Sequence, residues 1–364
     1  MFIQTIGGLV AVFIAYVASR LGLDNFFRAT IQVYLWLFVF VSAVALLAFV
    51  FQLRGWGLKG SSRRIVIVVP ALSQNGWFAE LIQEMFRRLH LYDYDVILKI
   101  PYEDFSREEQ LRIFKHLERH PDKYAGGIIV IYKHEQITKE ITELCSALDY
   151  PVVFADVRPF ESRSEYPENA AFVGYDAVKI GEAAARRVAK YLREAGTERP
   201  EVRVICTEVS QTKRQDAFCE KLREMFPGVN IEVKREGEFR RSNAKNIAVK
   251  FFKDSVKTEK YIDAVFCTND EMALGVYDAM LTVSYVGYKH PFLIGVDGTK
   301  SAKRLILNKD AHFDATVVQS TRELSQEIVD LLNRKIRKDM SPTEISLDPK
   351  MYDKEIAQAE ENDY

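Results

Sequence analysis

The sequence predicts an α/β fold of two Rossmann-like lobes with a cleft between them, preceded by two hydrophobic helices. Short, continuous apolar runs alternate with amphipathic segments, a pattern typical of parallel sheets that helices cover on both faces. This alternation restarts near residue 175, which indicates a second doubly wound unit in series. The hydrophobic helices are predicted from the dense share of apolar residues in the first 52 positions.

The N-terminal region, 1–54, is predicted to anchor the chain in a membrane. Residues 31–51 carry no charged side chain, and about 20 apolar residues are enough to cross a bilayer. We therefore expect a transmembrane helix over about 31–52, with Tyr34, Trp36 and Trp56 as interfacial aromatics. Residues 2–18 form a shorter apolar stretch. They complete a helical hairpin through 20–28 in one interpretation and lie in the interface in another.

Two features of the sequence bear on which side of the membrane holds the rest of the chain. Four basic residues between 54 and 64 follow the second helix, against Arg20 and Arg28 in the loop before it. The positive-inside rule then favours a cytoplasmic domain. The four cysteines are read as free thiols, which are typical of the cytosol, although a disulfide between Cys206 and Cys219 is an alternative.

A glycine- and serine-rich tether, 55–63, leads into a two-lobed domain over 64–348. Lobe 1 is assigned about 64–174 and 320–340, lobe 2 about 175–319 and 341–348, and 349–364 is expected to be an acidic tail that frays. Apolar runs of strand length predict strands at 65–69, 96–100, 127–131, 152–155, 201–206, 231–233, 264–267, 292–296 and 315–318. Helical periodicity predicts helices at 77–91, 108–119, 137–148, 177–195, 215–226, 243–253, 271–282 and 324–338.

Polar and aromatic side chains gather just after the predicted strands. Ligands of parallel α/β sheets bind beyond the carboxyl ends of the strands. Carboxylates, amides and guanidinium groups can pair with two neighbouring hydroxyls, and aromatic planes pack on the C–H faces of a sugar ring. Each residue alone has another interpretation, as a helix cap or as part of the core. The candidates at strand ends are Asn75, Trp77, Phe78, Asp156, Arg158, Arg214, Asn269, Asp297 and Gln319.

Three motifs carry a resemblance to a known family. The segments 264–275 (AVFCTNDEMALG), 294–299 (IGVDGT) and 315–319 (ATVVQ) resemble the ribose-binding branch of the type I periplasmic binding proteins. The resemblance covers roughly 64–345, in the same order and spacing. It implies a fold of the periplasmic-binding-protein-like I type, in which two lobes joined by three crossovers close around a monosaccharide.

The resemblance also implies roles for single residues. Trp77 and Phe78 resemble the aromatic pair that holds the sugar ring, with Asn75 or Gln74 as the polar residue before them. Asp156 matches the acid after the fourth strand. The ribose binders have an arginine next, where this chain has Val157 followed by Arg158, which puts ribose itself in question. The remaining matches are Arg214, Phe239, Asn269, Asp297 and Gln319.

The function implied by the resemblance is solute binding at a cell membrane, for transport or sensing. The family places such a domain outside the cytoplasm, with a membrane permease or a sensor as partner and the lipid bilayer contacted through 1–54. The alternative is a membrane-tethered regulatory or sensory subunit that uses the same fold for a non-sugar ligand or a partner.

Other classes of function find little support in the sequence. No G-x-S-x-G, H-E-x-x-H or Walker A motif is present, so we expect no enzyme, no cofactor and no metal site. Asp156 and Asp297 could form a glycoside-hydrolysing carboxylate pair, although the resemblance implies that both accept hydrogen bonds from hydroxyls. The formal net charge of −1 and the apolar N-terminus argue against nucleic acid as a partner.

Overall fold

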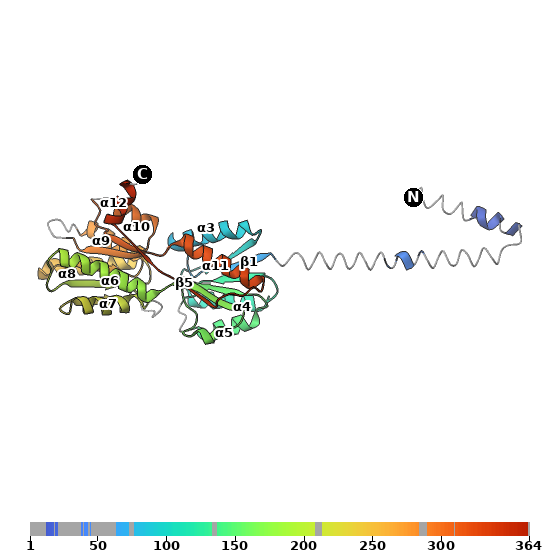
Figure 1. The fold of residues 1–364 in the computed structure, drawn as a ribbon, viewed down its shortest axis with the longest axis horizontal. Helices are drawn as coiled ribbons and strands as arrows, with labels where there is room; N and C mark the ends of the chain where they lie inside the picture. Colours follow the sequence, from blue (N-terminus) through green and yellow to red (C-terminus); the bar gives the residue numbers. More distant parts are fainter. Residues whose placement is uncertain are drawn as a thin grey trace. The chain divides into compact units, whose positions relative to one another are not determined.

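Each lobe is built on a six-stranded, mainly parallel sheet (Figure 1). The computed structural model describes residues 12–17, 19–20, 38, 40–42, 44, 63–72, 76–132, 137–207, 213–283, 290–308 and 310–362. The chain divides into two compact units, Met1–Ser62 and Arg63–Tyr364.

Little of the N-terminal unit is described. Its described residues are helical and exposed. The rest of the predicted anchor, 1–54, and the tether up to Ser62 lie outside the described residues. Within the described part of the chain, no helix combines the length and the apolar composition needed to cross a membrane.

Lobe 1 has the strand order β11-β5-β4-β3-β1-β2. Ile65 and Ile67 of β1 pack in one core cluster with Leu81 of α3 and Leu324 of α11, whereas Val66 packs with α4 and α5 on the opposite face (Figure 1). The strands are β1 Arg64–Val68, β2 Asp95–Lys99, β3 Gly126–Ile129, β4 Val152–Ala155, β5 Ala170–Tyr175 and β11 Glu344–Leu347. The helices are α3 Gly76–Leu91, α4 Arg107–Glu118, α5 Thr138–Ala147, α11 Thr321–Ile336 and the 3-10 turn η2 Arg163–Glu165.

Lobe 2 repeats this plan with the strand order β12-β10-β9-β8-β6-β7. Val204 of β6 packs in the same cluster as α6 and α7, and Val265 of β8 packs with α8 and α9 on the other face. The strands are β6 Glu201–Ile205, β7 Asn230–Lys234, β8 Ala264–Cys267, β9 Phe292–Asp297, β10 Ala315–Val318 and β12 Lys350–Asp353. The helices are α6 Ala177–Glu194, α7 Arg214–Met225, α8 Arg241–Thr258, α9 Asp270–Thr282, α10 Lys300–Leu307 and α12 Lys354–Asn362.

Two glycines let neighbouring helices of lobe 2 pack backbone to backbone. A Cβ on Gly181 of α6 would lie 2.2 Å from the carbonyl oxygen of Arg214, the first residue of α7. A Cβ on Gly275 of α9 would lie equally close to the carbonyl oxygen of Arg241, the first residue of α8. A glycine is therefore needed at each contact, and Gly181 sets the position of Arg214.

The strands and helices predicted for the two-lobed domain are all present, but the C-terminal assignments were wrong in two places. The segment 341–348 does not join lobe 2, because β11 pairs in parallel with β5 of lobe 1. The segment 349–364 is not a frayed tail up to residue 362, because β12 pairs antiparallel with β10 and α12 follows it. Tyr352 and Ala357 are buried in the core of lobe 2. The segment is polar on average, and the prediction of a frayed tail overlooked these two apolar residues.

The chain passes between the lobes three times, after β5, after β10 and after β11. The two C-terminal strands, β11 and β12, are each held to their own lobe by an arginine. Arg158 lies over the Phe172 ring of β5 and pairs with Glu344 of β11. Arg187 lies over the Phe292 ring and pairs with Asp353 of β12 at 2.7 Å. Buried carboxylates thus hold both C-terminal strands in place.

Candidate functional site

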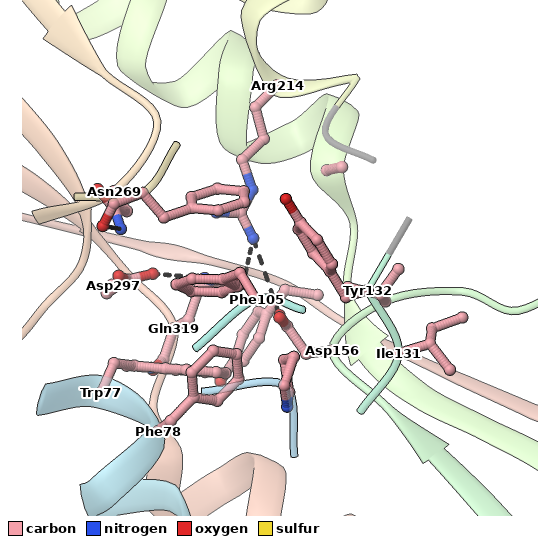
Figure 2. A pocket seen from close by; sticks show the side chains of 15 residues that line it. Trp77, Phe78, Phe105, Ile131, Tyr132, Asp156, Arg214, Asn269, Asp297 and Gln319 are labelled. Carbon is pink, nitrogen blue, oxygen red and sulfur yellow. Dashed lines mark hydrogen bonds and ion pairs between the residues drawn. The ribbon is translucent and has the colours of Figure 1, made fainter. Parts of the chain in front are cut away.

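One cavity lies where the carboxyl ends of strands from both lobes meet, and Figure 2 shows the 15 side chains that line it. The cavity has a volume of about 60 Å³. This volume is enough for several ordered water molecules. Its lining combines two carboxylates, one guanidinium and two amides with six aromatic rings. The residues are Pro70, Trp77, Phe78, Phe105, Ile131, Tyr132, Asp156, Val157, Tyr175, Ala177, Arg214, Phe239, Asn269, Asp297 and Gln319.

The two lobes contribute equivalent residues to this cavity. Phe105 follows the edge strand β2, and Phe239 follows β7, the matching edge strand of lobe 2. Asp156 follows β4 and Asp297 ends β9, the third strand in each sheet. All four backbones have positive φ, at 63° and 57° for the phenylalanines and 65° and 116° for the aspartates. Such backbones are costly outside glycine and cluster at functional sites.

A polar network ties Arg214 to the residues around it, as the dashed lines of Figure 2 show. Its guanidinium donates to the Thr268 carbonyl at 3.0 Å and to Gln319 Oε1 at 3.1 Å. The Gln319 amide in turn donates to Asp297 Oδ1 at 2.9 Å. Arg214 also forms a longer ion pair of 3.8 Å with Asp156. Arg214 and Gln319 therefore link the acidic residues of the two lobes.

The carboxylates of the site have pKa values above their usual range. Burial raises the pKa of Asp156, and the nearby Arg214 guanidinium opposes that rise. The pKa of Asp297 lies well above 3.8, because burial and then the charge of Asp270 both disfavour its ionised form. Burial raises the pKa of Asp270 to about 7, although Thr299 and Thr316 donate hydrogen bonds to it.

Asn269 both caps a helix and lines the cavity. The interpretation as a helix cap and the interpretation as a site residue are therefore compatible. Its Oδ1 accepts from the Met272 N–H at 2.9 Å at the start of α9. Its Nδ2 donates to the Phe239 carbonyl at 3.4 Å. The capping bond fixes the side chain at the point where α9 meets the cavity.

Aromatic rings from both lobes form the apolar part of the wall. Trp77 and Phe78 meet edge to face with centroids 5.3 Å apart, and the Trp77 indole donates to the Gln319 carbonyl at 3.0 Å. Phe105 contacts Tyr132 of its own lobe at 5.4 Å and Phe239 of the other lobe at 5.5 Å. In Figure 2 the rings of Phe105 and Tyr132 lie beside the polar network.

The structure brings eight of the ten candidate residues together at this cavity, namely Trp77, Phe78, Asp156, Arg214, Phe239, Asn269, Asp297 and Gln319. Asn75 and its alternative Gln74 lie outside the described residues. Arg158 does not line the cavity, contrary to prediction. Its guanidinium pairs with Glu344, whose side chain is only 6% exposed.

Sequence reasoning missed Phe105, Tyr132 and several apolar neighbours. Tyr132 directly follows the predicted strand 127–131, so the rule applied to the other strand ends would have found it. Phe105 lies six residues beyond β2, and no local pattern signals that its loop turns back to the cavity. The side chain of Asp104 accepts from the Leu72 N–H at 3.1 Å, which helps to hold that loop.

The cysteines and the acidic residues show no second chemical centre in the described part of the chain. All four cysteines are free and buried, and burial raises the pKa of the Cys145 and Cys206 thiols to about 12. No three His, Cys, Asp or Glu side chains of the described residues are grouped as a metal ion would require.

Two α/β lobes that share one polar and aromatic cavity define a two-lobed binding fold. A family model described as a periplasmic binding protein domain matches residues 65–339, and the chain belongs to that family. The prediction of this fold type is confirmed.

Known relatives and solved structures resemble most of the chain. The HTH-type transcriptional repressor PurR of Mannheimia succiniciproducens is 25% identical over 300 residues, 81% of each protein. A periplasmic solute-binding protein of an Actinobacillus succinogenes ABC transporter, with bound D-allose, superposes with a TM-score of 0.69 at 19% identity, over 81% of this chain and 99% of that one. A solute-binding protein from Bacillus halodurans, with bound myo-inositol, has a TM-score of 0.67 at 18% identity, over 84% and 99%.

Proposed function

We propose that this protein is a solute-binding protein that closes its two lobes around a small polyhydroxylated ligand, a monosaccharide or a close analogue. The observation that carries the proposal is the convergence of carboxylates, amides, a guanidinium and aromatic rings on one cavity between the lobes. Hydroxyl groups both donate and accept, and such side chains match them in pairs.

The roles of the lining residues follow from their chemistry. Asp156 and Asp297 accept hydrogen bonds from hydroxyls, whereas Arg214, Asn269 and Gln319 donate to hydroxyl or ring oxygens. The rings of Trp77, Phe78 and Phe239 pack on the C–H faces of the ligand. The sugars and polyols named for the solved structures of this fold support this ligand class.

The site holds and releases a ligand without transforming it. Arg214, Gln319 and Asp297 already bond to one another, so a ligand hydroxyl replaces a bond that exists in the free protein. Ligand binding then shifts the lobes toward their closed arrangement, and that shift is the signal that a permease or sensor reads.

We further propose that residues 1–54 anchor the domain to a cell membrane, with the domain on the extracytoplasmic side. The charge-free stretch 31–51 supports the anchor, and the family match supports the location. A Met340→Cys variant tests it, because Met340 is fully exposed and the native cysteines are buried. An impermeant thiol reagent should label intact cells that carry the variant; labelling only after lysis would place the domain in the cytoplasm.

A second candidate is a membrane-tethered regulatory subunit with a non-sugar ligand. The similarity to a transcriptional repressor over 81% of each protein favours a regulatory output, and Val157 stands where the ribose binders have an arginine. The apolar N-terminal region, without a basic recognition helix, argues against DNA binding by this chain.

Calorimetric titration of the intact chain with a panel of monosaccharides and polyols tests the proposed function. Asp297→Ala should weaken the binding of whichever compound saturates the wild type by about tenfold or more, since a hydrogen bond to a charged group is lost. Asp216→Ala is the matched control, because Asp216 lies on α7 with its side chain 61% exposed. Failure of every sugar and polyol to bind would refute the proposal.

A further inference from the structure

The charged groups around the cavity do not balance. Among the described residues that line it, Asp156 and Asp297 carry carboxylates and Arg214 carries the one guanidinium. With both carboxylates ionised, two negative charges and one positive charge leave an excess of one negative charge. Arg214 is 7% exposed and Asp297 6%. Bulk water therefore screens this imbalance poorly.

Asp156 is the carboxylate with the weaker protein partners. Its Oδ1 is buried and accepts no hydrogen bond, and its ion pair with Arg214 spans 3.8 Å. The Arg214 guanidinium is instead committed to the Thr268 carbonyl and Gln319. A buried carboxylate without a close donor is costly, so this position favours a further cation.

The residues that follow Asp156 supply no such cation. Val157 lines the cavity with an apolar side chain. Arg158 is directed to Glu344, which also pairs with Arg163. Arg158 carries the positive charge nearest in sequence to Asp156. Its guanidinium pairs with Glu344 of β11 and not with Asp156.

A third carboxylate adds to the negative charge behind the cavity wall. Asp270 is fully buried, and its two oxygens accept from Thr316 Oγ1 and the Thr299 N–H, both at 2.7 Å. Neither donor carries charge. When ionised, Asp270 adds to the negative charge around Asp297, whose pKa it raises.

The aromatic wall suits a cation as well as a sugar ring. Phe105 contacts both Tyr132 and Phe239, and Trp77 and Phe78 form a second group. Ring faces attract ammonium groups, and the attraction grows where water is excluded.

We propose that the ligand is a small polyhydroxylated molecule with a protonated amino group, as in an amino sugar, and that its ammonium group lies beside Asp156. This inference rests on the proposed function and narrows its ligand class. The hydroxyls meet Asn269, Gln319 and Asp297, while the ammonium supplies the positive charge that the described lining residues lack. A neutral sugar leaves Asp156 with only its 3.8 Å ion pair to Arg214, and an acidic sugar adds to the excess.

Calorimetric titration of the intact chain with matched ligands tests this assignment. The probes are D-glucosamine and D-galactosamine, their parent hexoses, and N-acetyl-D-glucosamine, which keeps the substituent and loses the charge. An amino sugar should bind at least about tenfold more tightly than its parent and its acetylated form, since removing one partner of a buried charge pair costs that much or more.

Two variants separate the charge from the shape of the site. Asp156→Asn should bring the ratio of amino sugar to parent affinity close to one, because the remaining lining charges then balance. Val157→Arg should act in the same direction by adding the missing guanidinium. Asp216→Asn, exposed on α7, should leave the ratio unchanged. Circular dichroism and thermal melting of each variant establish that it is folded.

The outcomes distinguish this inference from the proposed function. Neutral hexoses that bind as tightly as their amino forms, or more tightly, overturn the amine assignment and leave the proposed function standing. An unchanged ratio in a folded Asp156→Asn variant also overturns the place given to the ammonium. Binding of no sugar, neutral or aminated, in this or the wider panel overturns both.

Discussion

Asp270 and Asp297 make the stability of the fold depend on pH. Burial raises the pKa of Asp270 from 3.8 to about 7 and holds the pKa of Asp297 well above 3.8. A group whose pKa is raised in the folded state binds its proton more tightly there than in the unfolded chain. Its stabilising effect is complete below about pH 4 and is lost as the pH rises through about 7.

We therefore expect Asp270 to lower the free energy of unfolding as the pH increases from about 4 to about 7. Asp270→Asn should flatten this dependence. Urea unfolding at several pH values, followed by tryptophan fluorescence, measures it, with the exposed Asp216→Asn as control. Parallel curves for the wild type and Asp270→Asn would show that Asp270 does not titrate in this way.

The candidate site was largely predictable at the residue scale because strand ends are readable in sequence. Asp156, Asp297 and Gln319 each follow an apolar run directly, and the parallel sheet then brings them to one edge. Arg158 also follows a predicted strand, but its guanidinium pairs with Glu344 of β11, which lies 186 residues later in the chain. No local sequence pattern predicts a long-range ion pair of this kind. Likewise, no local pattern predicts that the loop of Phe105 turns back to the cavity.

At the scale of elements, the contact between α6 and α7 positions the guanidinium of the site. Gly181→Ala would place a Cβ 2.2 Å from the Arg214 carbonyl oxygen and 2.9 Å from the Phe218 nitrogen. The helices must then separate and move Arg214 away from Gln319. We expect a loss of about 1–3 kcal/mol in stability, as for other overpacked contacts, together with weaker binding of any ligand that saturates the wild type.

The control for this prediction is Gly228→Ala, where the nearest heavy atom to a new Cβ lies 3.8 Å away. Thermal unfolding and calorimetric titration of both variants provide the comparison. A Gly181→Ala protein with the affinity and melting temperature of the wild type would mean that α6 and α7 can separate without moving Arg214.

The strands that the sequence did not reveal share a physical cause. β5 is rich in alanine and glycine, which have low strand propensity, and its burial comes from neighbours on both sides. β11 and β12 are short edge strands whose polar residues are satisfied by Arg158 and Arg187. Periodicity identifies elements that bury a face of their own, and these strands are stabilised by partners distant in the chain.

At the scale of the whole molecule, direct contacts join the lobes around the cavity. Arg240 donates to the Asp104 carbonyl at 3.3 Å, beside the contact of Phe105 with Phe239. Lys213 pairs with Glu161 at 3.3 Å, with both side chains about two-thirds exposed. Exposed ion pairs contribute little, so the pair of Lys213 with Glu161 is expected to add little to the ring contact. These contacts are therefore expected to hold the lobes together in the ligand-free protein.

We expect Phe105→Ala to shift the ligand-free protein toward a more open arrangement, because it removes the ring that bridges the lobes. Spin labels on Met340→Cys in lobe 1 and Leu281→Cys in lobe 2 report the separation, since both sites are exposed and the native cysteines are buried. Phe86→Ala, on an exposed part of α3, is the control. The Phe105→Ala distance distribution should move to longer values without ligand, while the Phe86→Ala distribution matches the parent. Identical distributions for all three proteins would show that the contact between Phe105 and Phe239 does not hold the lobes together.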